Sequence, residues 1–242
     1  MIGSIEGKIA LVTGAARGLG LSIARYLAAA GANGLAVDLH ADFQDIPANW
    51  LSHEGDVSDE SDMAASIESL RARFGRLDIV VANAGLVPPW RDTEDIDLAE
   101  WDQVFAVNVR GVMATIKTAV PLMRATGGSI IVMGSRNSYR SHPRQCLYTA
   151  TKHAVLALTH SFNMDEFKNG LRACCLSPGE VATPILKLRP VPPSAEDMAK
   201  MLQPEDLGRT IAFVASMPAH ACINEILISP THNRSFVTPT ML

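Results

Sequence analysis

Short runs of consecutive apolar residues alternate along this chain with longer segments in which apolar residues return every three or four positions. The short runs predict buried strands at 8–13, 34–38, 51–57, 77–82, 129–134, 171–177 and 224–229. The longer segments predict helices at 18–30, 59–74, 97–126 with an internal break, 148–169 and 205–216. Such alternation is typical of a parallel sheet covered on both faces. We therefore expect an α/β, doubly wound Rossmann fold of about seven strands.

Composition indicates one domain, residues 1–242. The chain has 242 residues, of which 48% are hydrophobic, and this is enough for one well-buried core. No repeat, low-complexity segment or linker divides it. The formal net charge of −4 offers no basic surface for a nucleic acid. No apolar run is long enough to span a membrane and the first residues lack a signal-peptide core, so we expect neither a nucleic-acid nor a membrane partner.

The four cysteines predict a reduced, cytoplasmic protein. Cys174 and Cys175 are adjacent on a predicted strand and point to opposite faces, so a disulfide between them is not expected. No cysteine or histidine spacing fits a metal site, and we predict none. Cys146 and Cys222 are interpreted as packing residues too. Cys146 stands two residues before a tyrosine discussed below, so a reactive thiol is the alternative at that position.

Glycines follow the first predicted strand at once. Gly14, Gly18 and Gly20 lie between the strand and an amphipathic helix, in the pattern T-G-x-x-x-G-x-G. A strand, a glycine turn and a helix leave unpaired N–H groups and the positive helix end facing the turn, which suits a pyrophosphate. The alternative is that the glycines only make a tight turn and allow close packing.

The second predicted strand, GLAVD, ends in Asp38. A carboxylate at this position can accept hydrogen bonds from both ribose hydroxyls of an adenosine, and it would repel a 2′-phosphate. Asp38 therefore predicts NAD rather than NADP as cofactor. Arg17 in the glycine turn argues the other way, because a guanidinium there could reach a phosphate. The alternative for Asp38 is an ordinary exposed turn residue.

Tyr148 and Lys152 are four residues apart in the stretch YTATK, and Ser135 precedes the tyrosine by thirteen residues. A spacing of four places both side chains on one face of a helix, one turn apart. The lysine charge then favours the phenolate form of the tyrosine. The three residues together predict a proton-transfer site. Two alternatives apply to the serine. Ser135 could have no role other than capping the end of the strand, and Ser138 is close enough to be mistaken for it.

With these motifs the chain resembles the short-chain dehydrogenase/reductase family, from about residue 5 to 230. Several separated segments match the family in the right order: the cofactor turn TGAARGLG with Gly14, Arg17, Gly18, Leu19 and Gly20; the adenine-contacting pair Asp56 and Val57; the segment Asn83, Ala84 and Gly85; the helix residue Asn108; the trio Ser135, Tyr148 and Lys152; and the nicotinamide loop Pro178, Gly179, Val181 and Thr183.

The resemblance implies an oxidoreductase that moves a hydride between NAD and the carbinol or carbonyl carbon of a small polar alcohol, polyol, sugar or hydroxy acid. It implies that Tyr148 is the general acid/base, that Lys152 also holds the nicotinamide ribose, and that Ser135 binds the substrate oxygen. Asn108 would hold a water that connects Lys152 to solvent. Alternatively it could satisfy backbone groups at a helix kink, and this role is compatible with holding the water. The resemblance also points to a homotetramer.

Two departures from the family pattern are visible. The chain between Asp38 and Asp56 is short and contains Pro47, so we expect the second crossover helix to be reduced to a turn or two. The last strand reads INEILISPTHN, without the usual glycine-rich ending. This puts the local cofactor contacts and the packing of the tail in doubt, but not the fold.

Substrate contacts are expected from three segments: the loop after Gly85, residues 136–145, and the segment after Thr183. Trp90 and Ile185, with Leu186, would form an apolar wall, while Asn137 and Gln145 would hydrogen-bond substrate oxygens. Residues 183–204 are expected to cover the substrate. The loop also carries Arg136, Arg140, His142 and Arg144. An arginine binding a carboxylate is one interpretation, and a solvated loop or subunit contact is the preferred one.

Two helices, 97–126 and 148–169, have apolar residues on more than one face and so need a second partner besides the sheet. The apolar residues at helical spacing are Val112, Ile116, Val120, Val155, Leu158 and Phe162. A matching helix of another subunit would supply that partner. Two rival functions stay open: an NADP-linked carbonyl or 3-oxoacyl reductase, and a non-catalytic NAD-sensing regulator on the same fold.

Overall fold

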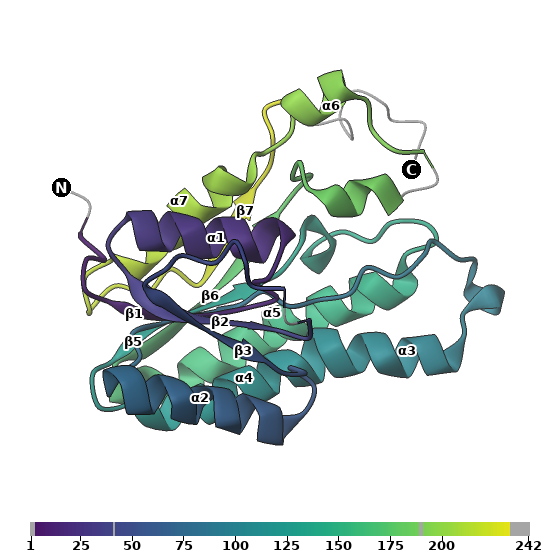
Figure 1. Ribbon diagram of the computed structural model, residues 1–242. Helices are drawn as coiled ribbons and strands as arrows, with labels where there is room; N and C mark the ends of the chain where they lie inside the picture. The colour runs from purple at the N-terminus through teal and green to yellow at the C-terminus, as the bar shows by residue number, and fades with distance from the viewer. Residues whose placement is uncertain (1–2, 41, 189–190, 233–242) are drawn as a thin grey trace.

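The computed structural model describes residues 3–40, 42–188 and 191–232. These residues form a seven-stranded sheet in which all paired neighbours are parallel, in the order β3-β2-β1-β4-β5-β6-β7 (Figure 1). The strands are β1 (Ile9–Thr13), β2 (Asn33–Asp38), β3 (Trp50–Glu54), β4 (Ile79–Ala82), β5 (Gly128–Met133), β6 (Leu171–Pro178) and β7 (Glu225–Ile228). The predicted doubly wound α/β fold is confirmed.

Helices cover both faces of the sheet (Figure 1). One face carries α1 (Gly18–Ala29) and α7 (Pro204–Ala215), and the other carries α2 (Glu60–Phe74), α4 (Gly111–Met123) and α5 (Cys146–Glu166). Each helix buries the apolar stripe that its sequence predicts. In α2, for example, Met63, Ile67 and Leu70 return at helical spacing and are all buried against the sheet.

The central strands are buried on both faces, which explains their continuous apolar sequences. All five residues of β1 are buried, because alternate side chains enter the two hydrophobic clusters above and below the sheet. Leu11 faces the cluster of α2 and α4, whereas Val12 faces the cluster of α1 and α7.

The strand order reverses at β1, which pairs with β2 on one side and with β4 on the other. In open parallel sheets such a reversal opens a crevice at the carboxyl ends of the strands, where ligands bind. The glycine turn follows β1, and Asn83 and Ser135 follow the ends of β4 and β5. The fold therefore brings these separated motifs to one edge.

The connection from β2 to β3 has no helix in the residues described between them, 39–40 and 42–49, so its reduction is greater than predicted. Two turns close it, with hydrogen bonds from Ile46 N–H to Phe43 O and from Trp50 N–H to Pro47 O. Phe43, Ile46 and Trp50 pack on the α1 side of the core, in place of a crossover helix. So few residues cannot form both a helix and its two loops.

The predicted break in the 97–126 helix is a π-helical segment. The helix α3 (Leu98–Phe105) passes into η2 (Ala106–Arg110) and then into α4. Among the described helices the sequence did not predict four short ones: η1 (Thr93–Asp95), η3 (Arg136–Ser138), η5 (Pro184–Leu188) and α6 (Ala195–Ala199). The helix predicted at 148–169 is α5 followed by the 3₁₀ turn η4 (Phe167–Asn169). In the described parts of the chain, none of the helices is both long and apolar enough to cross a bilayer.

Candidate active site

The glycine turn after β1 is closed by contacts that only glycine allows. A Cβ on Gly20 would lie 2.0 Å from the carbonyl oxygen of Gly14, and one on Gly14 would lie 2.9 Å from Ala84 Cα. Gly14 and Gly18 both have positive φ, +64° and +59°. Leu19 is half-buried in the first turn of α1. The turn is thus a tight cradle at the start of α1.

Thr13 connects this turn to the next strand of the crevice. Its hydroxyl oxygen accepts the N–H groups of Asn83 and Ala84, each at 3.1 Å. The Asn83 amide donates in return to the carbonyl oxygens of Thr13, at 2.9 Å, and Gly14, at 3.3 Å. In the sequence Thr13 is only the first residue of the glycine motif, because the residues that it bonds lie about 70 positions away.

The N-terminus of α1 faces the same turn. Arg17 is its N-cap and makes no side-chain capping hydrogen bond, and the first turn carries no acidic residue. The helix N-terminus therefore keeps its positive end for an anion. The side chain of Arg17 is exposed.

Asp38 ends β2 and is anchored beside the turn. Its carboxylate accepts the N–H of Ala16 at 2.9 Å and that of His40 at 3.3 Å. These bonds fix the carboxylate next to the glycine turn, and Asp38 is half-buried, so the alternative of an ordinary exposed turn residue does not describe it. A carboxylate has about four acceptor positions, so two N–H bonds leave room for ribose hydroxyls.

The pair after β3 has a more internal role than the sequence suggested for its side chains. The Asp56 carboxylate accepts the N–H and the hydroxyl of Ser58, both at 2.8 Å. Val57 is buried and lies against Gly111, where a Cβ would come within 2.8 Å of the valine methyl group. Both residues therefore fix the wall of the crevice next to the end of β3.

The two serines after β5 have different environments. Ser138 is 1% exposed; its hydroxyl accepts the N–H of Ser135 and donates to the carbonyl oxygen of Lys152 at 2.9 Å. Ser135 is half-buried, and its hydroxyl accepts the N–H of Asn137 at 3.1 Å. Ser138 is thus an internal link between η3 and α5, whereas Ser135 is only half-buried and its hydroxyl accepts a single N–H.

Tyr148 and Lys152 stand on one face of α5, as their spacing predicts. The ammonium nitrogen of Lys152 lies 5.5 Å from the centroid of the Tyr148 ring. Lys152 is 7% exposed, and its ammonium donates to the carbonyl oxygen of Met133 at 2.8 Å. That carbonyl ends β5, two residues before Ser135. The lysine charge is therefore held between the tyrosine ring and the strand end.

Asn108 lies in the π-helical segment and is 1% exposed. Its amide oxygen accepts the N–H of Leu86 at 2.7 Å, and its amide nitrogen donates to Leu86 O at 2.9 Å. The same nitrogen lies 3.3 Å from the Thr151 hydroxyl on α5. Gly85 is adjacent, because a Cβ there would be 3.2 Å from Asn108 Oδ1. Asn108 thus joins the loop after β4 to the helix of Lys152.

The predicted nicotinamide loop follows β6. Pro178 is the last residue of that strand, and Gly179 donates its N–H to Ile228 O at 2.7 Å. Val181 is buried and pairs with Leu202, with Ala182 N–H donating to Leu202 O at 2.8 Å. Thr183 is also buried. The pairing of Val181 with Leu202 brings the two ends of the predicted covering segment, 183–204, together as a narrow neck. Residues 189–190 of this segment lie outside the described part.

The four predicted substrate residues fall into two groups. The Asn137 amide nitrogen donates to Gln145 Oε1 at 2.8 Å and to the Thr149 hydroxyl at 3.1 Å, and Asn137 is 6% exposed. Both its N–H groups are used within the fold, so Asn137 supports Gln145 rather than presenting its own donors. Trp90 and Ile185 have exposed side chains, in the loop after β4 and in η5.

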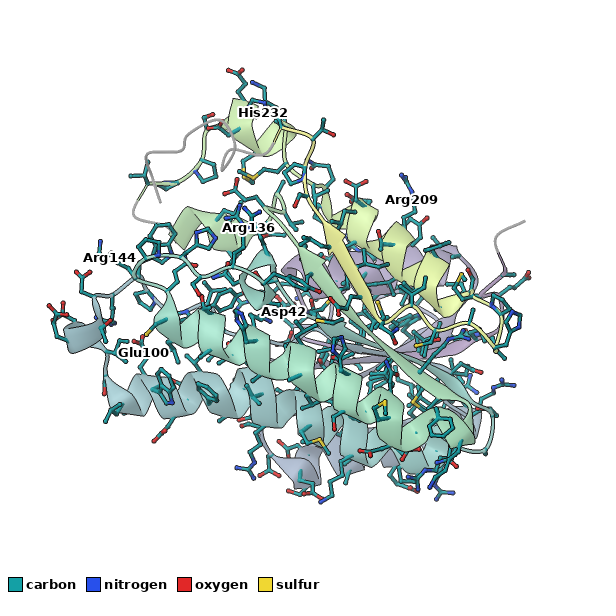
Figure 2. The ribbon with its side chains drawn as sticks, turned by 180° about the vertical axis from the view of Figure 1, so that it is seen from behind. Asp42, Glu100, Arg136, Arg144, Arg209 and His232 are labelled. Carbon is teal, nitrogen blue, oxygen red and sulfur yellow. The ribbon has the colours of Figure 1, made fainter. Side chains whose placement is uncertain are left out.

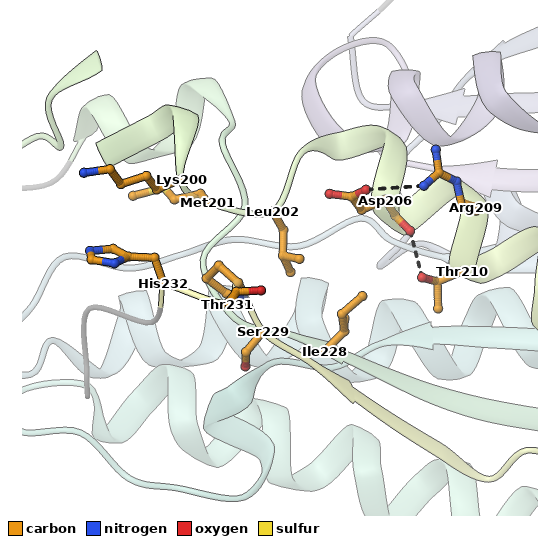
Figure 3. A pocket seen from close by; sticks show the side chains of 11 residues that line it. Lys200, Met201, Leu202, Asp206, Arg209, Thr210, Ile228, Ser229, Thr231 and His232 are labelled. Atoms are coloured by element: carbon orange, nitrogen blue, oxygen red, sulfur yellow. Dashed lines mark hydrogen bonds and ion pairs between the residues drawn. The ribbon is translucent and has the colours of Figure 1, made fainter. Parts of the chain in front are cut away.

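A separate hollow of about 500 Å³ lies between the connection of α6 to α7 and the end of β7 (Figure 3). Its wall includes Leu202 from the neck and also Asp206, which lies 4.0 Å from Arg209 (Figure 3). None of the predicted catalytic or cofactor residues lines it. The crevice at the strand ends therefore remains the candidate site.

The cysteines are free thiols. Burial raises the pKa of Cys174 to about 12 and raises that of Cys175 as well. Burial likewise raises the pKa of Cys222. These shifts keep the three thiols protonated at neutral pH. Across the described ranges, no three His, Cys, Asp or Glu side chains are grouped as metal ligands.

The arrangement fits a dinucleotide and an alcohol. The cradle of Gly14 and Gly20 leaves no room for a Cβ, the N-terminus of α1 faces it, and the carboxylate of Asp38 stands beside it. A buried ammonium, a phenol and a hydroxyl gather where β5 meets α5. Such groups can bind a substrate oxygen and move its proton.

Comparisons with known proteins agree with this geometry. A family profile described as short chain dehydrogenase matches residues 8–190. L-fucose dehydrogenase of Rattus norvegicus is 32% identical over 230 residues, covering 89% of this chain and 85% of that protein. Cis-4-hydroxycyclohexanecarboxylate dehydrogenase of Sinomonas cyclohexanicum is 32% identical over 234 residues, covering 91% and 94%.

Among solved structures, a 3-ketoacyl-(acyl-carrier-protein) reductase from Brucella melitensis, complexed with NADH, superimposes with a TM-score of 0.82 at 28% identity. The similarity covers 93% of this chain and 98% of the reductase. It extends over the sheet and the helices on both of its faces, so the likeness is one of the whole fold.

Proposed function

The chain belongs to the short chain dehydrogenase family, and from that premise we propose that it oxidises or reduces a small polar alcohol or ketone with NAD(H). The observation that carries the proposal is the position of the Lys152 ammonium. It is buried, 5.5 Å from the Tyr148 ring and bonded to the carbonyl at the end of β5. A buried cation in that place can stabilise negative charge that develops beside it while a proton moves.

Each residue has a defined task in the proposed reaction. Ser135 donates a hydrogen bond to the substrate oxygen and holds it near Tyr148. Tyr148 takes the hydroxyl proton in oxidation and returns it in reduction. Lys152 stabilises the phenolate and binds the nicotinamide ribose. Asn108 holds a water that connects Lys152 to solvent. When bound, a nicotinamide dinucleotide accepts or supplies the hydride.

The cofactor contacts are proposed on the same geometry. The turn of Gly14, Arg17, Gly18, Leu19 and Gly20 holds the pyrophosphate. Asp56 and Val57 contact the adenine, the segment Asn83–Gly85 borders the cofactor, and Pro178, Gly179, Val181 and Thr183 enclose the nicotinamide. Asp38 supports NAD over NADP, because its anchored carboxylate repels a 2′-phosphate.

The substrate class is proposed as a polyol, sugar or hydroxy acid. Two relatives act, by name, on a sugar and on a cyclic hydroxy acid, L-fucose and cis-4-hydroxycyclohexanecarboxylate. Gln145, Trp90 and Ile185 are the side chains proposed to surround it. The covering segment closes over it from the neck at Val181 and Leu202.

The test is a screen of the purified protein with NAD⁺ or NADP⁺ and a panel of alcohols that includes both of these compounds. We expect reduced nicotinamide to form with NAD⁺. The kcat/KM with NAD⁺ should be at least about tenfold higher than the kcat/KM with NADP⁺. Asp38→Ser should narrow this ratio, whereas the same change at the exposed Asp42 should not. A preference for NADP⁺ would favour the carbonyl or 3-oxoacyl reductase instead. Tight NAD binding with no turnover of any alcohol or ketone would favour the regulator.

We also propose a cytoplasmic homotetramer. The residues expected to form a second helix face include Val112, Ile116 and Phe162, but these are buried in the chain's own core. The open apolar surface contains one expected residue, Leu158 on α5. Its other apolar residues are Phe105, Ala106, Val109 and Met113 on α3, η2 and α4, and Asp102 and Arg110 also line it. Such a surface suits a two-fold contact between copies. Elution as a monomer at micromolar concentration would contradict the tetramer.

A further inference from the structure

Asn137 is hydrogen-bonded both to the hydroxyl of Ser135 and to the beginning of α5. It is the second residue of η3 and is only 6% exposed. Its main-chain N–H donates to the Ser135 hydroxyl oxygen at 3.1 Å. Its side-chain nitrogen donates to Gln145 Oε1 at 2.8 Å and to the Thr149 hydroxyl oxygen at 3.1 Å. One buried residue thus connects Ser135 to Gln145 by two hydrogen bonds.

Gln145 lies on the side of α5 that carries the proposed base. It is the N-cap of the helix and precedes Tyr148 by three residues and Lys152 by seven. At about 100° per residue, these spacings place the three side chains within about 60° of one another around the helix axis. Figure 2 shows Arg144, the residue before Gln145, beside the N-terminal end of α5. Gln145 is half-buried, so the surrounding protein does not enclose it.

The bond from Asn137 fixes which end of the Gln145 amide is used inside the fold. A carboxamide has one oxygen, which accepts, and one NH₂ group, which donates two hydrogens. The oxygen of Gln145 accepts from Asn137, and Asn137 uses its two hydrogens on Gln145 and Thr149. The NH₂ group of Gln145 is the other end of the amide and is turned away from Asn137. Gln145 therefore presents donors rather than an acceptor.

The Ser135 hydroxyl is oriented through the same residue. Its oxygen accepts the N–H of Asn137, and a hydroxyl has one hydrogen to donate besides its acceptor positions. That hydrogen cannot point toward the N–H group, because both carry hydrogen. The hydroxyl of Ser135 and the NH₂ group of Gln145 are thus two donors, and each is directed away from Asn137.

We propose that Asn137 is a positioning residue that directs these two donors at two oxygen atoms of the substrate. Ser135 bonds the oxygen that reacts, and Gln145 bonds a second, accepting oxygen. The inference rests on the proposed function, in which both residues contact substrate, and it narrows the substrate class to molecules with such a second oxygen. A simple alcohol would leave the Gln145 donors without a partner in the closed site, and this weakens binding.

Binding of alcohols to the protein–NADH complex tests the presented donor, because a reduced cofactor cannot accept their hydride. Calorimetric titration compares cyclohexanol with cyclohexanediols and with methoxycyclohexanols, in which the second oxygen lies one, two or three ring carbons from the first. An ether oxygen can only accept a hydrogen bond. For at least one spacing, we expect both the diol and the ether to bind about threefold to tenfold more tightly than cyclohexanol. A gain for the diols alone, or no gain at any spacing, overturns the proposal.

Variants separate the orientation of the donors from general support of the fold. Asn137→Ala lets the Gln145 amide turn, so the gain from the ether should be lost. Cyclohexanol should keep its affinity, because the main-chain N–H to Ser135 remains. Asn163→Ala is the matched control: it removes a side-chain amide from the same helix that bonds the main chain of Ala173. It should lower the melting temperature and keep the gain. A gain that survives Asn137→Ala removes Asn137 from this role.

The orientation of the amides can also be measured without any alcohol. In NMR spectra of the protein–NADH complex, the side-chain N–H signals of Asn137 should exchange slowly with heavy water and those of Gln145 quickly. Asn137→Ala and Gln145→Glu assign the signals by removing them. The reverse pattern would mean that Gln145 donates to Asn137, and it would refute the inference. Failure of the proposed function is distinct, because it would appear as absent turnover with every alcohol while the exchange pattern is unaffected.

Discussion

The amide of Asn108 and the main chain of Leu86 are joined by two reciprocal hydrogen bonds of 2.7 and 2.9 Å. Leu86 follows the segment Asn83–Gly85, so these bonds attach the loop after β4 to the π-helical segment. Through Thr151 the same amide reaches α5, which carries Tyr148 and Lys152. One buried side chain thus fixes the distance between two walls of the candidate site.

Asn108→Leu is predicted to lower both stability and turnover. It removes two hydrogen bonds to the main chain, at a cost of about 1–3 kcal/mol, and it removes the proposed water-holding group. Urea unfolding and kcat measure the two effects. Asn108→Asp is the matched variant, because it keeps the acceptor for Leu86 N–H and replaces the donor to Leu86 O with an ionisable oxygen. Equal stability of wild type and Asn108→Leu would contradict the structural role.

Tyr148→Phe is predicted to abolish turnover and leave cofactor binding intact. The change removes one oxygen atom and keeps the ring beside Lys152, so the loss should reach about 10²–10⁴-fold or more in kcat. NADH fluorescence titration measures the retained binding. Turnover within a few-fold of the wild type would remove Tyr148 from its assigned role.

The two serines after β5 should respond in opposite ways. Ser138→Ala leaves the carbonyl of Lys152 and the N–H of Ser135 without their partner, so it should lower the free energy of unfolding by about 1–3 kcal/mol. Ser135→Ala should affect stability less and reduce kcat/KM by about tenfold or more. Thermal unfolding and steady-state kinetics on the same preparations distinguish the two. A larger catalytic loss in Ser138→Ala, with stability retained, would reverse the assignment.

Gly20→Ala and Gly18→Ala form a second matched pair. The new Cβ at Gly20 would lie 2.0 Å from a main-chain oxygen, so the turn must open, at a cost of about 3 kcal/mol or more. At Gly18 nothing lies within 4 Å of the new atom, and only the positive φ opposes it, by about 1–2 kcal/mol. NAD affinity should fall much further in Gly20→Ala. Similar affinities in the two variants would mean that the close contact does not shape the cradle.

The fold could be predicted from the sequence because the residues within each strand and helix indicate that element by themselves. A strand buried on both faces needs a continuous apolar run, and β1 and β4 have one. The site was predictable for a related reason: its motifs lie directly after strands, and parallel strands place their carboxyl ends at one edge. Spacing alone then brought Tyr148 and Lys152 to one face of α5.

What the sequence did not predict depends on contacts between distant segments. The bonds of Thr13 to Asn83 and Ala84 join residues about 70 positions apart. Helical spacing placed Val112 and Phe162 correctly on a helix but could not distinguish the sheet face from the open face. The positive φ of Arg144, +63°, is likewise a conformation that no propensity favours for arginine, so the sequence does not predict the path of the loop that carries it.

Asp78 provides a stability prediction away from the site, at the opposite end of the sheet. Its side chain is 4% exposed, at the start of β4, and accepts the N–H of Ile9 at 3.0 Å and hydrogen bonds from Arg76 and Lys8. Burial works to raise the pKa of this carboxyl, but the bonds from Arg76 and Ile9 and the charge of Lys8 hold it below its usual range.

A carboxyl whose pKa is lower in the folded than in the unfolded state contributes stability above the unfolded value, about 3.9, and loses that contribution as pH falls through the folded value. Asp78→Asn should therefore be about 1–2 kcal/mol less stable than wild type at pH 7, and the difference should shrink below pH ~4. Asp78→Ala should cost more, because it also leaves Ile9 N–H unpaired. Glu68→Gln, which breaks an exposed pair with Arg71, is the control and should have no measurable effect. Urea unfolding across this pH range measures all four proteins. A difference that stayed constant into acid would mean that Asp78 stabilises the sheet by its shape and not by its charge.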